Sequence, residues 1–225
     1  MEASEGRAII PRRGLQGCAC RGLTRLGNSQ QIRSTTVLAV RRDGEVSMGA
    51  DGQVTVGDIV MKAGARKVRR VYHDQVLVGF SGATADAFSL FERFERQLER
   101  FNGSTRRAAD ELTREWRSDR FLRELEAWLL IAGREGILVL SGNGDVVEPD
   151  DELAAIGSGG PYAQAAAKAL LRATQLSAPE ITRIGLETAA SMCIYTNEQI
   201  SVDTVHFSPE PHEARADDVQ IGGRT

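Results

Sequence analysis

The chain has 225 residues, of which 41% are hydrophobic and 26% are charged, a composition typical of a soluble globular protein. Its net charge of −3 gives no overall positive field that would attract nucleic acid or an anionic membrane. No apolar run approaches the roughly 20 residues of a membrane-spanning helix, and the odd count of three cysteines does not indicate a disulfide framework.

Residues 1–34 differ from the remainder because they are rich in arginine and show no sustained period of two or 3.6 residues. Three interpretations stay open: a cleaved propeptide, a start codon assigned too far upstream, or an organellar transit peptide. The first two place the protein in the bacterial cytoplasm, and the third in a mitochondrion. We expect a folded domain over 35–206 and a flexible tail, rich in Pro, Glu, Asp and Gly, over 207–225.

The first half of the domain predicts strands joined by tight turns. Asp43-Gly44 between two extended runs is typical of a hairpin, because glycine tolerates the positive φ of a tight turn. A second hairpin is expected to bend at His73 and Asp74. The four strands are expected over Thr36–Val40, Glu45–Asp51, Lys67–Tyr72 and Gln75–Ser81.

Two amphipathic helices are expected next. Thr84 can cap the first, whose phenylalanines repeat at three and four residues, and Asn102-Gly103 ends it. Ser104 or Thr105 can cap the second. The second helix is expected to bury one stripe of side chains, namely Leu112, Trp116, Leu122, Leu125 and Leu129.

The second half predicts three further strands and then two further helices. The strands are expected over Gly136–Leu140, Asp145–Val147 and Leu153–Ile156. One helix should begin near Pro161, and the other should run from Ser177 or Pro179 to about Cys193. This order favours an α+β fold, in which two stacked antiparallel sheets lie between two layers of helices, over an alternating parallel fold.

Thr35-Thr36 opens the first strand and carries a specific chemistry. A threonine hydroxyl is a poor nucleophile without a base, but an N-terminal threonine has one in its own α-amine, which titrates near about 7.7–8.0. Such an enzyme needs no catalytic histidine, and the three histidines of the chain are scattered. By itself the pair also fits the ordinary β propensity of threonine, so the motifs around it must decide between a nucleophile and an ordinary strand residue.

Several motifs follow the threonine pair in a fixed order. They are Thr35–Gly44 (TTVLAVRRDG), Ala50–Gln53 (ADGQ), Met61–Arg70 (MKAGARKVRR), Ala85–Phe88 (ADAF), Ser141–Val147 (SGNGDVV), Ile156–Ala167 (IGSGGPYAQAAA) and Cys193–Asn197 (CIYTN). Together they closely resemble the HslV (ClpQ) family, the proteasome-like peptidase subunits of bacteria. The resemblance extends over about residues 35–197 without large gaps.

The resemblance implies a role for each of five residues. Thr35 would be the nucleophile, and Lys67 would place a positive charge beside it that stabilises the oxyanion. Asp51 would hold Lys67 or the terminal amine. Gly82 would offer its backbone N–H to the oxyanion, and Ser158 would complete the surroundings of the site.

Plainer interpretations exist for the same residues. Without the motif, Lys67 would be a surface lysine on a basic strand face, and Asp51 would be a turn residue. The glycine-rich stretch Gly157–Gly160 before a helix could bind an anion, but it lacks the Lys-Ser/Thr of a nucleotide-binding P-loop.

The resemblance also implies a fold, a cofactor and partners. The fold would be that of the N-terminal nucleophile hydrolases, a four-layer αββα sandwich. A monovalent cation, sodium, would bind backbone carbonyls of Ala190, Cys193 and Thr196. Two stacked hexameric rings would enclose the active sites, and the ATPase HslU would feed unfolded proteins into them, since this chain has no nucleotide motif of its own.

The sequence departs from the family pattern at several positions, and other functions stay open. Residues precede the nucleophile, Ser34 stands where proteasome-type precursors have glycine, and Ala50 and Ala190 stand where glycine is expected. One alternative is a catalytically silent ring subunit in which Thr35 is never freed. Another is a hydrolase of non-peptide amides, and a third is a nucleic-acid-binding module that uses Arg66–Arg70.

Overall fold

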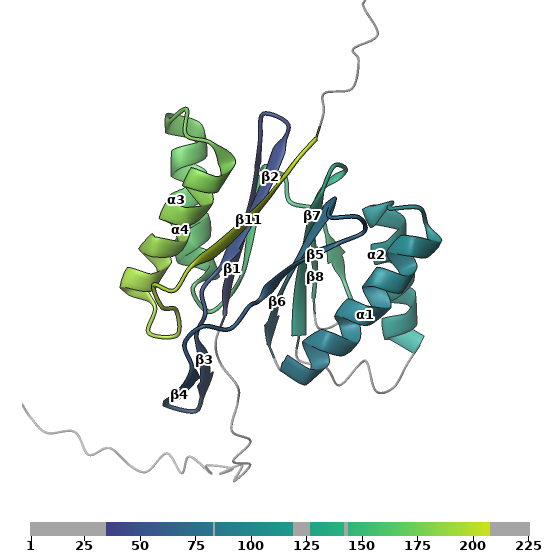
Figure 1. The fold of residues 1–225 in the computed structure, drawn as a ribbon, viewed down its shortest axis with the longest axis horizontal. Helices are drawn as coiled ribbons and strands as arrows, with labels where there is room; N and C mark the ends of the chain where they lie inside the picture. Colours follow the sequence, from purple (N-terminus) through teal and green to yellow (C-terminus); the bar gives the residue numbers. More distant parts are fainter. Residues whose placement is uncertain (1–34, 83, 119–126, 142–143, 208–225) are drawn as a thin grey trace, which may run out of the picture.

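The computed structural model describes residues 35–82, 84–118, 127–141 and 144–207, with residues 84–88 described only as backbone. Two antiparallel sheets lie face to face, and a pair of helices covers the outer face of each (Figure 1). The expected four-layer αββα sandwich is therefore confirmed. No helix in these ranges is both long and apolar enough to cross a membrane.

The first sheet carries Thr36 at the start of its β1 strand. Its strand order is β10-β1-β2-β11, so the first hairpin lies in the middle. Asp43 and Gly44 turn this hairpin with φ values of 50° and 79°, as the Asp-Gly pair predicts. The strands are β1 (Thr36–Arg42), β2 (Glu45–Ala50), β10 (Leu153–Gly157) and β11 (Ser201–His206).

The second sheet has the strand order β5-β6-β7-β8-β9. Its strands are β5 (Val68–Val71), β6 (Val76–Gly82), β7 (Ala127–Gly133), β8 (Gly136–Leu140) and β9 (Val146–Val147). The helical stripe predicted to reach Leu129 is wrong at that residue, which lies in β7. A short apolar run buried on both faces has no period that separates a strand from a helix. Leu122 and Leu125 lie outside the described residues.

The helices follow the predicted order, and one predicted stop signal and one predicted start signal are present. Asn102 and Gly103 leave the first helix with φ values of 51° and 83°. Ser177 and Glu180 form a capping box at the start of the last helix. The helices are α1 (Thr84–Arg100), α2 (Thr105–Ser118), α3 (Gly160–Ala173) and α4 (Ala178–Met192).

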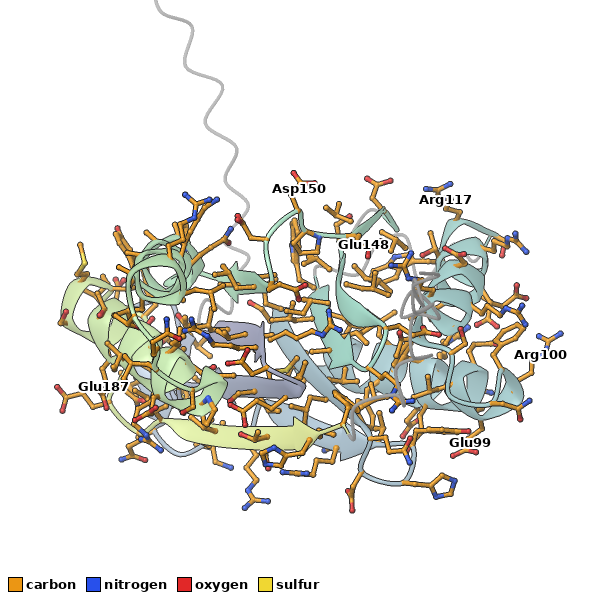
Figure 2. All side chains as sticks on the ribbon, turned by 90° about the horizontal axis from the view of Figure 1, so that it is seen from above. Glu99, Arg100, Arg117, Glu148, Asp150 and Glu187 are labelled. Carbon is orange, nitrogen blue, oxygen red and sulfur yellow. The ribbon has the colours of Figure 1, made fainter. Side chains whose placement is uncertain are left out.

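Three hydrophobic cores fill the spaces between the four layers, and β1 shows how the strands divide between them. Val37 and Ala39 point into the core between the two sheets, whereas Leu38 and Val40 point toward α3 and α4. The third core lies between the second sheet and α1 and α2. Charged side chains such as Glu99 lie on the outside of the layers (Figure 2). Because β1 is buried on both of its faces by these cores, it is held rigidly in place.

A small hairpin, which the sequence did not predict, projects from the body near the start of β1 (Figure 1). It consists of β3 (Val54–Val56) and β4 (Ile59–Lys62), and all four residues of β4 are exposed. The Ala65 N–H donates to the Gly52 carbonyl at 2.9 Å and closes the base of the hairpin. Asn197 fixes this base to the body, since its Nδ2 donates to the Ala63 carbonyl at 2.9 Å.

Candidate active site

Thr35 lies directly before β1 and is held there by β10. The Ser158 N–H donates to the Thr35 carbonyl at 2.9 Å, and Thr36 pairs with Gly157. Gly157 has a φ of 91°, and a Cβ at this position would lie 1.8 Å from the Thr35 carbonyl oxygen. Only glycine therefore fits beside Thr35 at this point. In the full-length chain Thr35 is buried, with 3% of its surface exposed.

Asp51 follows β2 and is completely buried. Its Oδ1 accepts hydrogen bonds from the Thr36 N–H at 2.7 Å and from Lys67 Nζ at 3.0 Å. Its Oδ2 accepts the N–H groups of Gln53 at 2.8 Å and Asn197 at 3.4 Å. A carboxylate with four donors is fixed in orientation and well compensated for burial. Asp51 therefore ties Lys67 to the strand that carries Thr35.

Lys67 is buried, with 2% of its surface exposed, whereas Arg69 and Arg70 on the following strand are exposed. Burial lowers the pKa of the Lys67 ammonium, and the attraction of Asp51 offsets part of this shift. The interpretation of Lys67 as a surface lysine on a basic strand face is therefore wrong. Because Lys67 is buried, little water screens the electrostatic interactions of its charged group.

Gly82 ends β6 with a φ of 118°, in the left-handed range that favours glycine. Its neighbour Ser81 comes close to the start of β1, because a Cβ on Gly157 would lie 3.0 Å from Ser81 Oγ. Ser158 is bonded to Thr35 through its backbone, and its residue surface is exposed. The ends of β6 and β10 thus converge on the start of β1.

Thr36 has a second set of contacts that the sequence did not predict. Its Oγ1 accepts the Gly159 N–H at 3.0 Å and shares a hydrogen bond of 2.7 Å with Thr196 Oγ1. Asn197 was likewise missed, although it ends the CIYTN motif. Its side-chain oxygen accepts the Gly52 N–H at 3.1 Å, and its backbone N–H donates to Asp51.

The loop Ser158-Gly159 directs two backbone donors at β1. The Ser158 N–H donates to the Thr35 carbonyl, and the Gly159 N–H donates to Thr36 Oγ1. These groups position the threonine pair and are engaged there, in contrast to the free donors of an anion cradle. On the basic strand face, Arg70 forms an ion pair with Asp203 at 3.1 Å.

The residues predicted to hold a cation lie at the end of α4. Ala190 lies in its last turn, Cys193 is its C-cap, and the Thr196 N–H donates to the Cys193 carbonyl at 3.0 Å. Carbonyls at a helix C-terminus carry partial negative charge, and a carbonyl with one hydrogen bond retains a second lone pair. Among the described residues, no group of three or more His, Cys, Asp or Glu could hold a metal. Backbone carbonyl oxygens are the type of donor that binds monovalent cations in proteins.

Comparisons with known proteins match the part of the chain that forms the sandwich. The family model of proteasome subunits matches residues 32–205. An ATP-dependent protease subunit HslV from Syntrophobacter fumaroxidans is 57% identical over 172 residues, which cover 76% of this chain and 96% of that protein.

Two solved structures share the fold. The crystal structure of eukaryotic HslV from Trypanosoma brucei has a TM-score of 0.73 and 42% identity, over 76% of this chain and 99% of that one. BPH of Thiobacillus denitrificans in complex with epoxomicin has a TM-score of 0.63 and 27% identity, over 77% of this chain and 100% of that one.

The four-layer fold and the family match place the chain in one class of protein. It belongs to the proteasome family of threonine peptidases and, within that family, to the HslV subunits. The resemblance noted in the sequence is thereby confirmed.

Proposed function

We propose that Thr35, once it is the first residue of the chain, is the nucleophile that cleaves peptide bonds. Its free α-amine accepts the hydroxyl proton while Oγ bonds to the peptide carbonyl carbon, and the carbonyl oxygen becomes an oxyanion. When the C–N bond breaks, the protonated amine returns the proton to the leaving amine. Water then hydrolyses the acyl ester, with the same amine as base, and regenerates Thr35.

The buried pair of Asp51 and Lys67 is the observation that carries this proposal. Asp51 Oδ1 accepts hydrogen bonds from both Lys67 Nζ and the Thr36 N–H. The charged group of Lys67 is therefore tied to Thr36, the residue that follows the proposed nucleophile in the chain. A cation there stabilises the oxyanion and disfavours protonation of the α-amine, which keeps the base neutral. The Gly82 N–H is the second donor to the oxyanion in this proposal, and Ser158 holds Thr35 in place.

A chain that begins at Thr35 tests the assignment of the nucleophile. Thr35→Ala should abolish peptide hydrolysis while assembly is unchanged, and Thr35→Ser should retain partial activity because the hydroxyl and amine both survive. Thr36→Ser is the matched control at the neighbouring position and should remain active. Turnover at the wild-type rate in Thr35→Ala would refute the assignment.

The active form in this proposal is two stacked hexameric rings, into which the ATPase HslU feeds unfolded proteins. The support is the identity to a protein named as a subunit of an ATP-dependent protease, and the absence of a P-loop motif from the sequence. The exposed apolar residues Ile59, Val60 and Met61 on β4 are typical of a surface that contacts other chains.

Two measurements test these partners. Native mass spectrometry should detect the mass of the twelve-subunit assembly that two six-membered rings form. Small peptides should be cleaved faster when HslU and ATP are added. Degradation of folded proteins should require both components. Efficient degradation of a folded protein by this chain alone would contradict the proposal.

We place the protein in the bacterial cytoplasm, or in a mitochondrion if residues 1–34 prove to be a transit peptide.

The proposal also includes a sodium ion held by the carbonyl oxygens of Ala190, Cys193 and Thr196. Such an ion would fix the turn that follows α4. Because Thr196 in this turn shares a hydrogen bond with Thr36, the ion would also help to hold Thr36 in position. Exchange of sodium for choline at constant ionic strength should lower both peptide activity and the melting temperature. Unchanged values of both would remove the ion from the proposal.

A further inference from the structure

Ser81 carries a hydroxyl that faces the first sheet and has no role in the proposed mechanism. Its direction follows from the alternation of side chains along β6. A Cβ on Gly79 would lie 2.6 Å from Val37 Cγ1, so Gly79 faces β1 across the space between the two sheets. Ser81 lies two residues further along β6 and therefore faces the same sheet.

Ser81 Oγ and the carbonyl oxygen of Thr35 lie close to the same point, which is the place of the missing Cβ of Gly157. A Cβ there would be 1.8 Å from the Thr35 carbonyl oxygen and 3.0 Å from Ser81 Oγ. The two oxygens are therefore separated by no more than the sum of these distances. Because Gly157 has no side chain, no atom of that side chain stands between them.

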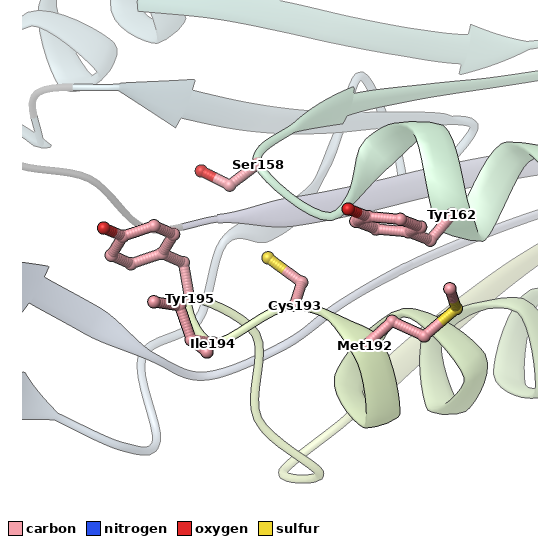
Figure 3. A pocket seen from close by; sticks show the side chains of 6 residues that line it. All are labelled: Ser158, Tyr162, Met192, Cys193, Ile194 and Tyr195. Carbon is pink, nitrogen blue, oxygen red and sulfur yellow. The ribbon is translucent and has the colours of Figure 1, made fainter. Parts of the chain in front are cut away.

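Ser81 is buried, in contrast to Ser158, which also lies beside Thr35. Ser158 is exposed, and its side chain lines a pocket of about 500 Å³ between the start of α3 and the end of α4 (Figure 3). Only 9% of the surface of Ser81 is exposed, and its hydroxyl has no hydrogen-bond partner among the residues that the structure describes. Buried hydroxyls in proteins are nearly always hydrogen-bonded to the protein or to ordered water. A nearby acceptor for the Ser81 hydroxyl is therefore expected.

The backbone on both sides of Ser81 belongs to the site. On one side, the Phe80 N–H donates to the Lys67 carbonyl at 3.2 Å. On the other side, Gly82 carries the N–H that donates to the oxyanion in the proposed function. A hydrogen bond from Ser81 to Thr35 thus connects the strand that carries the oxyanion donor to the residue that carries the nucleophile.

We propose that Ser81 is a positioning residue whose hydroxyl donates to the Thr35 carbonyl oxygen, directly or through one water. The inference rests on the proposed function and deepens it. The carbonyl oxygen accepts the Ser158 N–H at 2.9 Å, and a carbonyl oxygen has two lone pairs, so it can accept a second donor. The bond from Ser81 holds the nucleophile at a fixed distance from the Gly82 N–H. A displacement of about 1 Å between reacting groups can cost about 100-fold in rate.

The test compares Ser81→Ala with the wild type, both as assembled chains that begin at Thr35. The variant should lower kcat for a peptide by about tenfold and leave KM unchanged, because the hydroxyl positions the reacting groups and does not touch the bound peptide. A peptide aldehyde, which forms a tetrahedral adduct with Thr35 Oγ, should lose about tenfold in affinity. The matching peptide alcohol, which forms no adduct, should bind as before. A merely structural role of Ser81 would weaken the binding of both ligands.

Ser81→Cys replaces the hydroxyl with a weak donor of similar size and should show the same loss of kcat. Ser47→Ala is the matched control, because Ser47 is also buried on a strand but pairs with Val40, away from the start of β1. Its kcat should equal that of the wild type. The inference is overturned by a wild-type kcat in Ser81→Ala or Ser81→Cys, or by equal weakening of the aldehyde and the alcohol. A wild-type chain that neither cleaves peptides nor binds the aldehyde would overturn the proposed function itself.

Discussion

Lys67 Nζ lies 3.0 Å from Asp51 Oδ1, and both side chains are buried. The same carboxylate oxygen accepts the Thr36 N–H at 2.7 Å, so the ammonium group is tied to the strand that begins beside Thr35. Removal of one member of such a pair leaves an uncompensated buried charge, which typically costs about 3–5 kcal/mol. The pair therefore connects the chemistry of the site to the stability of the fold.

Lys67→Met should lower kcat for peptides by about 100-fold or more, because it removes the charge that stabilises the oxyanion while keeping the length of the side chain. Lys67→Arg should also be poor, since a planar guanidinium does not replace a compact ammonium in a closed site. Lys168, which is half-buried and forms an ion pair with Asp151 away from the site, provides the control Lys168→Met. Steady-state kinetics check the result, and a kcat within about threefold of the wild type in Lys67→Met would contradict this role.

Asp51→Asn should move the alkaline limb of the pH profile of kcat/KM to lower pH. Burial lowers the pKa of Lys67, and the attraction of Asp51 opposes that shift, so its removal lets the pKa fall further. A protonated Lys67 is needed for oxyanion stabilisation, and activity is therefore lost at a lower pH. An alkaline limb that stays in place or moves upward would contradict the argument.

The same lowered pKa has a consequence for stability. Between the folded-state pKa of Lys67 and its ordinary value of 10.5, the unfolded chain binds more protons than the folded chain. The contribution of Lys67 to the free energy of unfolding therefore rises as the pH increases through this window. In Asp51→Asn the window should extend to lower pH, which denaturant titrations at several pH values can measure.

Gly157→Ala should damage the site more than a matched glycine substitution elsewhere. Both Gly157 and Gly57 have positive φ, so alanine costs about 1–2 kcal/mol of backbone strain at either position. A Cβ at Gly157 would also lie 1.8 Å from the Thr35 carbonyl oxygen, whereas one at Gly57 meets nothing within 4 Å.

Displacement of Thr35 should therefore lower peptide activity by about tenfold or more in Gly157→Ala, and hardly at all in Gly57→Ala. Chemical denaturation and peptide assays on both variants provide the comparison. Equal activity in the two variants would show that the close approach at Gly157 does not position Thr35.

Local signals in the sequence predicted much of the fold. The Asp43-Gly44 turn, the Asn102-Gly103 stop and the helix start at Ser177 all depend on neighbouring residues, and the structure has each of them. The strands β3, β4 and β11 were missed, and β7 was assigned in part to a helix. β11 pairs with β2 from about 150 residues away, and a contact of that range leaves no local pattern in a single sequence.

In the candidate site as well, motifs in the sequence indicated some residues, whereas contacts between distant parts of the chain were missed. The roles of Thr35, Asp51 and Lys67 came from the family resemblance, and the structure places Asp51 and Lys67 in contact. The hydroxyl of Thr36 was not predicted to do anything, because its partners Gly159 and Thr196 lie 123 and 160 residues away. The CIYTN motif, which contains Thr196, was the one signal that could have drawn attention to this contact.

The central claim is that Thr35 acts only with a free α-amine. While Ser34 is attached, the Thr35 nitrogen is an amide whose lone pair is delocalised, so it cannot accept the hydroxyl proton near neutral pH. The most direct test measures peptide hydrolysis and intact mass together, for the full-length chain and for a chain that begins at Thr35. The trimmed chain should be active, and the full-length chain should gain activity only as its mass falls by residues 1–34. A full-length chain that keeps these residues and hydrolyses peptides as fast as the trimmed one would contradict the account.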